Sequence, residues 1–208
     1  MFDYIHDPEE IRRRSIEAIR SEVNLDAFPE DIRPVAERMV HACGMPDIVA
    51  DLDFSTGAAA AGRAALADGA PVLTDSEMLR VGIIRDRLPA GNETVCTLNA
   101  EGVAQSAKAA GTTRSAAAVD LWRPMLEGAV VAIGNAPTAL FHLLELLAAG
   151  AGRPALVIGF PVGFIGAAES KGALIAVAGS VHYITLQGRR GGSALAAAAV
   201  NALTGNEG

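Results

Sequence analysis

Five short apolar segments alternate with helical segments along most of the chain, and this alternation restricts the fold more than any other feature. The apolar segments are 70–74, 93–98, 130–133, 155–158 and 181–186. Helical periodicity lies between and after them, at 76–81, 101–110, 115–125, 138–148, 167–175 and 193–203. Strands separated by helices pair in parallel through right-handed crossovers. The pattern therefore predicts an α/β fold of doubly wound type: a mainly parallel five-stranded sheet with helices on both faces.

The first 69 residues lack such apolar runs and predict an N-terminal helical lead-in. Asp7 and Pro8 open a helix that runs to about residue 23, and a second helix runs from about Pro29 to a stop at Gly44. Ser55 is expected to cap a third helix over 56–67. With no linker or repeat, we expect a single domain, 1–208, with a helical segment of about 1–69 and an α/β core of about 70–205.

Composition and charge exclude several classes of protein. The net charge is −7 and no basic tract is present, so we expect no nucleic-acid partner. The N-terminus has no apolar signal region, and the apolar stretch 139–149 is interrupted by His142 and Glu145, so we expect a cytoplasmic protein with no membrane partner. Cys43 and Cys96 lack metal-ligand spacing and are expected to be reduced, structural thiols.

In a doubly wound sheet, ligands bind beyond the carboxyl ends of the strands, and polar residues follow several of the predicted strands. The turn 134–138 contains Asn135 and Thr138, and its amides are expected to point outward and bind a carboxylate or phosphate, unless it is an ordinary strand-to-helix turn. Arg189, in the turn GRRGGS, either binds carboxylates or belongs to a flexible basic turn, and Lys171 is either an anion contact or a solvated surface lysine. Asp75 follows the first strand, and no nucleotide-binding glycine motif is present.

His41 is the strongest candidate for acid–base chemistry among the four histidines. It lies near the C-terminus of the second predicted helix, where the helix dipole favours the protonated imidazole, as suits a general acid. A capping or core role is the alternative; His142 is expected to be structural, and the strand residue His182 is ambiguous. No nucleophile elbow or metal-ligand cluster is present. An enzyme with this sequence is expected to bind a polyanionic small molecule and to use acid–base chemistry without a metal.

Several strings of residues, taken in order, resemble one family, the precorrin-8X methylmutases. The resemblance covers about Tyr4 to Leu203 and is closer to the enzyme of the aerobic, cobalt-late route. Its motifs are IRRRS from Ile11, RMVHACG from Arg38, LPAGNE from Leu88, TRSAA from Thr113, VAIGNAPTAL from Val131, PVGF from Pro161 and AAESK from Ala167.

The resemblance implies a cofactor-free isomerase of cobalamin biosynthesis with a flavodoxin-like fold. Such an enzyme moves a methyl group from C11 to C12 of precorrin-8X to give hydrogenobyrinic acid, and works as a homodimer with sites near the subunit interface. The family's catalytic histidine falls on His41, and its substrate contacts fall on Ser15 and Arg114. The polar candidates that we add as substrate contacts are Arg14, Asp75, Asn135, Thr138, Lys171 and Arg189.

Two other functions remain open from the sequence. A non-catalytic corrinoid carrier that binds hydrogenobyrinic acid would need the same carboxylate contacts. A nucleotide- or S-adenosylmethionine-dependent enzyme on a doubly wound sheet is disfavoured by the missing glycine fingerprint.

Overall fold

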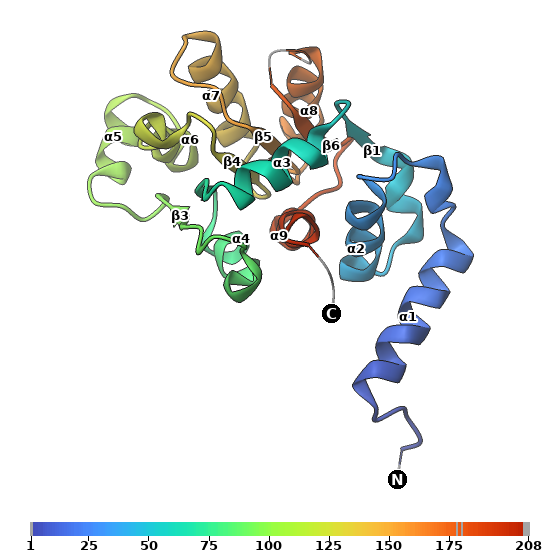
Figure 1. Cartoon of the computed structure of the whole chain (residues 1–208). Helices are drawn as coiled ribbons and strands as arrows, with labels where there is room; N and C mark the ends of the chain where they lie inside the picture. Colours follow the sequence, from blue (N-terminus) through green and yellow to red (C-terminus); the bar gives the residue numbers. More distant parts are fainter. Residues whose placement is uncertain (1, 178, 180, 206–208) are drawn as a thin grey trace.

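The computed structural model describes residues 2–177, 179 and 181–205, which form a layered α/β arrangement (Figure 1). The ends of the predicted domain, residue 1 and residues 206–208, lie outside the described residues. The strands are β1 (Leu52–Phe54), β2 (Val72–Thr74), β3 (Thr94–Cys96), β4 (Val130–Ile133), β5 (Leu156–Gly159) and β6 (Tyr183–Leu186).

The helices follow the predicted pattern along the chain. They are α1 (Pro8–Glu22), α2 (Arg33–Cys43), α3 (Ala58–Ala67), α4 (Glu77–Gly82), α5 (Val103–Ala109), α6 (Arg114–Asp120), α7 (Pro137–Ala148), α8 (Ala167–Ala176) and α9 (Ser193–Leu203). Short 3₁₀ helices join some of them, at η1 (Leu25–Ala27), η2 (Pro46–Asp51), η3 (Arg85–Arg87) and η4 (Arg123–Met125).

Alternate residues of the central strands pack on opposite faces of the sheet. On one face, Val130 and Ala132 belong to a core with residues of α2, α3, α4 and α9. On the other, Val131 and Ile133 pack with residues of α6, α7 and α8. Every residue of β4 and β5 is buried. Burial on both faces explains why these strands appear in the sequence as continuous apolar runs.

The strand order confirms the doubly wound prediction. The described strands form one sheet in the order β1-β6-β5-β4-β2-β3, and β2 to β6 pair in parallel. Without β1, this is the order of the flavodoxin-like sheet. The chain changes direction across the sheet between β2 and β4, so these neighbours define the topological switch point.

A sixth strand, β1, was not predicted, and it makes the sheet one strand wider than expected. β1 lies at the edge and pairs antiparallel with β6, with Leu52 opposite Leu186. Its central residue, Asp53, accepts a hydrogen bond from the Tyr183 hydroxyl at 2.7 Å. A three-residue strand with a carboxylate in its centre contains no apolar run, so the segment 1–69 read as helical throughout.

Four helix boundaries differ from the prediction. Helix α2, expected from about Pro29, begins at Arg33. Ser55 does not cap α3, which begins behind Gly57 (φ 76°); the Ser55 hydroxyl instead accepts a hydrogen bond from the Tyr183 N–H at 3.1 Å. The helix expected at 101–110 begins only after Gly102 (φ 82°). The helix expected at 115–125 divides into α6 and η4, because Pro124 has no N–H with which to continue the helical hydrogen bonds.

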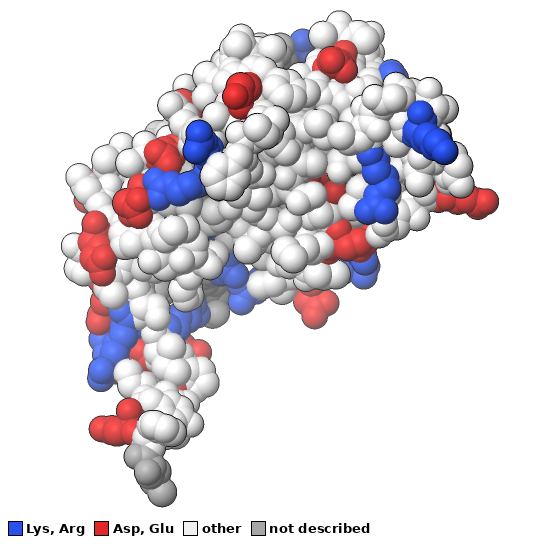
Figure 2. Space-filling view, turned by 180° about the vertical axis from the view of Figure 1, so that it is seen from behind, with Lys and Arg blue, Asp and Glu red and all other residues white. Residues whose placement is uncertain are grey.

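Helix α1 stands away from the rest of the molecule (Figure 1), and basic and acidic side chains are interleaved along it (Figure 2). Its only buried residue is Ile19, which joins Val23 in the core beneath α2. Apolar packing therefore supports α1 only along the face that carries Ile19. Among the described residues, none of the helices combines the length and the apolar character needed to cross a membrane.

We expect the substitution Gly134→Ala to destabilise the fold by about 1–3 kcal/mol, the usual cost of overpacking. A Cβ at Gly134 would lie 2.7 Å from the Ser193 Cα and 2.9 Å from the Ser193 N, which are backbone atoms at the start of α9. Urea unfolding would measure the loss.

Gly172→Ala is the matched control, because Gly172 lies in α8 with nothing within 4 Å of the added Cβ. It should be neutral or stabilise by about 0.5–1 kcal/mol, since alanine is the better helix former. Equal unfolding midpoints for the two variants would contradict the predicted contact.

Candidate functional site

The Asp75 carboxylate fills the turn at the switch point between β2 and β4. One oxygen accepts a hydrogen bond from the Gly134 N–H at 2.9 Å, and the other accepts from the N–H groups of Asn135 at 2.9 Å and Ala136 at 2.7 Å. Burial raises the pKa of Asp75, while these N–H donors act in the opposite direction. The expectation that the turn's amides face outward is therefore wrong, because the anion they bind is Asp75. The geometry does not support a substrate contact for Asp75, since both oxygens are engaged.

The start of α9 covers the same turn. The hydroxyls of Ser76 and Ser193 lie 2.9 Å apart and share a hydrogen bond, and Gly134 lies against the Ser193 backbone. Both serines are buried. The place where a doubly wound sheet usually receives a ligand is thus filled by the protein's own side chains.

Lys171 is buried and is therefore not a solvated surface lysine, while a substrate contact by Lys171 stays a prediction. Its ammonium group donates a hydrogen bond to the Arg190 carbonyl at 2.7 Å, and burial lowers its pKa to about 8, with Asp51 acting in the opposite direction. The Arg190 guanidinium forms ion pairs of 2.6 Å with both Asp47 and Asp51. Because Asp47 and Asp51 lie in η2, this network ties the β6–α9 loop to the segment that follows α2.

His41 lies exposed on the last turn of α2. The helix ends at Gly44 (φ 66°), whose N–H donates to the Val40 carbonyl at 2.8 Å. The opposite side of α2 is core, with Val35, Ala36, Met39 and Val40 buried, and the helix packs against α9. One face of α2 is therefore packed in the core, while the His41 imidazole lies at the surface on the opposite side.

Two clefts meet at His41 and share Arg38 and Asn201 as well. The arginine cleft, of about 390 Å³, lies between α1, α2, α3 and the end of α9; its polar lining residues include Arg12, Arg20, Arg38, His41, Arg63 and Asn201. The alanine cleft, of about 400 Å³, lies between α2, α9 and the end of α4, with Ala42, Ala194, Ala197 and Ala198 in its wall. The structure thus confines the surroundings of His41 to the helical layer on one side of the sheet.

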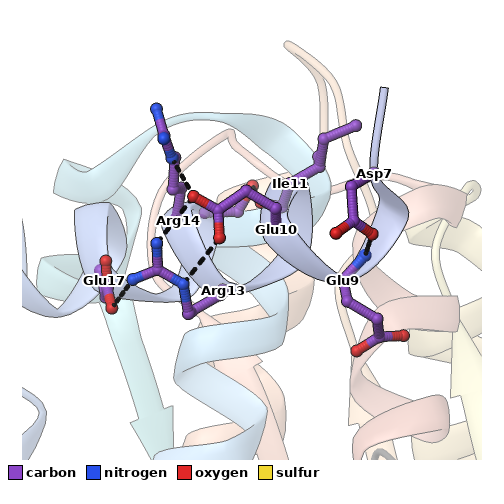
Figure 3. Close-up of polar contacts among 8 residues, drawn as sticks. Asp7, Glu9, Glu10, Ile11, Arg13, Arg14 and Glu17 are labelled. Atoms are coloured by element: carbon purple, nitrogen blue, oxygen red, sulfur yellow. Dashed lines mark hydrogen bonds and ion pairs between the residues drawn. The ribbon is translucent and has the colours of Figure 1, made fainter. Parts of the chain in front are cut away.

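The two candidates on α1 lie outside both clefts. Arg14 donates to Glu10 at 2.6 Å, and Ser15 donates its hydroxyl hydrogen to the Ile11 carbonyl at 2.8 Å. Arg13 binds the same Glu10 carboxylate, so hydrogen bonds from Arg13 and Arg14 lower the pKa of Glu10 to about 2 (Figure 3). Substrate contacts by Arg14 and Ser15 stay predictions.

Three other candidates gather around the starts of α6 and α7. Arg114 is exposed at the first position of α6, and the Thr113 hydroxyl that caps this helix lies 2.7 Å from the Thr138 hydroxyl. Asn135 is exposed in the turn that precedes α7. None of the three lines either cleft at His41. Within one copy of the chain, the predicted residues therefore form separate groups.

Arg189 lies at neither cleft and is stacked on an aromatic ring. Its guanidinium carbon is 5.5 Å from the centre of the exposed Phe164 ring, a cation–π geometry. Among the other histidines, His142 forms a hydrogen bond with Glu145 at 3.1 Å, and its other ring nitrogen lies 3.2 Å from the Asp120 carboxylate. Among the described residues, no three His, Cys, Asp or Glu side chains are grouped so that they could hold a metal ion.

Sequence reasoning missed the arginines that surround His41. Arg14 rather than Arg12 is among the predicted contacts, although the spacing of Arg12 places it on the inner face of α1. Arg12 lies four residues before Ile16 and eight before Arg20, which line the same cleft. Arg38 lies three residues before His41 and thus on the same side of α2. That periodicity was the available signal for both; Arg63 and Asn201 are brought in by the tertiary fold alone.

Comparison with known proteins identifies the family. A family model described as precorrin-8X methylmutase matches residues 10–205. The chain belongs to the precorrin-8X methylmutase family. Membership confirms the predictions of the family and of an isomerase of cobalamin biosynthesis.

Individual relatives agree with this assignment. The precorrin-8X methylmutase of Pseudomonas aeruginosa is 59% identical over 203 residues, covering 98% of each chain. The cobalt-precorrin-8 methylmutase of Priestia megaterium is 35% identical, covering 95% of this chain and 87% of the relative. A crystal structure of a precorrin-8X methylmutase from Thermus thermophilus superposes with a TM-score of 0.85 at 40% identity, covering 94% of each chain.

The buried Lys171 predicts a pH dependence of stability. Its pKa in the folded chain, about 8, is below the ordinary value of 10.5, so between these values the folded state binds fewer protons than the unfolded state. The wild type should therefore gain stability relative to Lys171→Met, on the order of 1 kcal/mol, as the pH rises from about 7.5 to about 9.5.

Urea unfolding of both proteins at the two pH values measures this difference. Lys108→Met, which removes an exposed lysine of α5, should show no such gain. A constant difference between the wild type and Lys171→Met would contradict the shifted pKa.

Proposed function

We propose that the protein converts precorrin-8X into hydrogenobyrinic acid by moving the methyl group from C11 to C12, with His41 as the general acid. The observation that supports this most is the position of His41, exposed on a fixed helix end where two clefts meet. Its family membership supplies the reaction class. A carrier that only binds the product is not favoured, since the family model and the relatives compared above are named as methylmutases.

The cobalt-free substrate is favoured by the pattern of relatives. The relatives from Pseudomonas aeruginosa and a Sinorhizobium species, named precorrin-8X methylmutase, are 59% and 51% identical. The cobalt-precorrin-8 methylmutases of Priestia megaterium and Salmonella typhimurium are 35% and 37% identical. We therefore propose the aerobic, cobalt-late substrate.

The proposed mechanism is an isomerisation in which atoms balance within one substrate. His41 donates a proton to the macrocycle, and the double bonds shift so that the C11–methyl bond breaks as the C12–methyl bond forms. A proton then leaves another position of the ring, so the product has the mass of the substrate. An imidazole suits this exchange because it both donates and accepts protons near neutral pH. The proposed reaction uses neither a cofactor nor a methyl donor.

The remaining features of the proposal concern assembly and organisation. We infer a cytoplasmic homodimer in which each chain, 1–208, is one domain, with the site near the subunit interface. The separation of Arg114, Asn135 and Thr138 from His41 within one copy supports this, because a second copy offers a way to bring the two groups to one substrate. The family match over 10–205 supports a single domain.

The proposed function predicts that His41→Ala loses turnover and keeps product binding. We expect the rate to fall roughly a hundred- to ten-thousand-fold, as is usual when a general acid is removed. The assay mixes protein with precorrin-8X without metal or methyl donor, and follows the visible spectrum and the product mass. His6→Ala is the control, because His6 is exposed in the N-terminal segment outside both clefts.

A wild type that leaves precorrin-8X unchanged would refute the methylmutase function for this chain. Binding of hydrogenobyrinic acid without any conversion would revive the carrier. If His41→Ala lost conversion and product binding equally, His41 would be a binding residue and another group would be the acid.

A further inference from the structure

The two clefts at His41 differ in chemistry. Among the described residues, the lining of the arginine cleft includes four guanidinium groups and the carboxylate of Glu37. This excess of positive charge occurs in a chain with 17 basic and 24 acidic residues and a net charge of −7. A local reversal of the overall charge concentrates anions at one place on an acidic protein.

The guanidinium groups reach the arginine cleft from three separate helices. Arg12 and Arg20 come from α1, Arg38 from α2 and Arg63 from α3. Arg20 pairs with Glu37 at 2.8 Å, and Arg63 donates one N–H to the Asp31 carbonyl at 3.2 Å. A guanidinium has five N–H donors, and this bond of Arg63 uses one of them. Convergence from several helices suits a ligand with carboxylates at several points along one edge.

The alanine cleft offers a surface of small side chains on the other side of His41. Ala194, Ala197 and Ala198 of α9 line it together with Gly82, the last residue of α4, and Ile84, which follows that helix. With so few side-chain atoms, this wall is suited to the flat, apolar body of a ring system, which can lie close to the helix. Neither cleft, at about 390 and 400 Å³, is large for a small-molecule site, so a macrocycle would extend across both.

Asn201 forms the border between the clefts and holds the alanine wall in place. Its side-chain oxygen accepts a hydrogen bond from the Ile84 N–H at 2.9 Å, and its side-chain nitrogen donates to the Gly82 carbonyl at 2.9 Å. The residue is 7% exposed. The side-chain amide of Asn201 therefore links α9 to the end of α4. This link holds the alanine cleft at a constant distance from the arginine cleft.

We propose that the arginine cleft binds the carboxylate side chains along one edge of the macrocycle while the ring itself lies in the alanine cleft. Arg12, Arg38 and Arg63 are then substrate-binding residues, and the boundary at His41 is the point where the charged edge meets the ring. The inference rests on the proposed function for the identity of the ligand. It assigns the orientation of that ligand relative to His41.

The first experiment titrates hydrogenobyrinic acid into single variants and follows its visible absorption. Arg12→Gln, Arg38→Gln and Arg63→Gln should each weaken binding by about tenfold, the effect of losing one charge-assisted hydrogen bond. Arg12→Lys and Arg63→Lys should recover part of the affinity, because the charge remains. Added salt should weaken the wild type more than the variants, because the cleft that it screens carries more charge.

Arg13→Gln is the matched control for Arg12→Gln. The two residues are neighbours on α1 and the change in charge is the same, but Arg13 binds Glu10 and Glu17 and lines neither cleft. Arg13→Gln should bind hydrogenobyrinic acid as the wild type does.

A second experiment blocks the alanine cleft without touching a charge. Ala194 is exposed near the start of α9, so Ala194→Trp places an indole in the cleft and should raise the Kd for hydrogenobyrinic acid at least tenfold. Ala104→Trp, at an exposed position of α5 outside the clefts, should leave the Kd unchanged. Circular dichroism and the unfolding midpoint of each variant establish that it is folded.

Folded variants of Arg12, Arg38 and Arg63 that bind the product as tightly as the wild type would overturn the proposal, as would equal losses in Arg12→Gln and Arg13→Gln. Unchanged binding by Ala194→Trp would overturn the placement of the ring. These outcomes are separate from a failure of the proposed function, which is a wild type that binds hydrogenobyrinic acid and converts no precorrin-8X.

Discussion

The contact between the Asp75 carboxylate and the amides of the β4–α7 turn is the interaction on which the arrangement of the sheet depends. It joins the end of β2 to the turn that follows β4, the neighbouring strand at the switch point. The three hydrogen bonds converge on a carboxylate that is 4% exposed. Removing one partner would leave buried polar groups unsatisfied, which is costly. With the serine pair of Ser76 and Ser193 beside it, this contact also sets where α9 begins.

Because the switch point is occupied by internal groups, the site that we propose lies away from the strand ends. In many doubly wound proteins the strand ends form the ligand site, but here those ends hold internal carboxylate and hydroxyl groups. The clefts around His41 are built instead by helices that pack on one face of the sheet or on one another. The ion pairs of Arg190 with Asp47 and Asp51 then tie the loop before α9 to the segment just after the helix that carries His41.

Much of the fold was predictable from the sequence because burial on both sheet faces leaves continuous apolar runs. β4 and β5 are buried throughout and fall where they were expected. β1 was not predictable in this way, because Asp53 interrupts it and its pairing partner lies more than a hundred residues away. His41 could be singled out by its place at a helix end, and family resemblance strengthened that choice.

The surroundings of the polar candidates were harder to predict. Asp75 and Lys171 look like solvent-facing polar residues after strands, yet each is directed inward at backbone groups, and only the tertiary fold determines this. Arg38 and Arg12 carry a helical spacing that points to the cleft, whereas Arg63 reaches it from a helix remote in sequence. Residues assembled from several elements leave no local pattern in the chain.

The alanines of α9 have a consequence for the dimensions of the whole assembly. This helix contacts the sheet on one side and both α2 and α4 on others, and almost all of its residues are buried. The thickness of α9 therefore determines the distance between α2, which carries His41, and the strands. A single methylene added on its inner side would shift the imidazole outward. The alanines of α9 thus keep this helix narrow, so that α2 and His41 lie at a defined distance from the sheet.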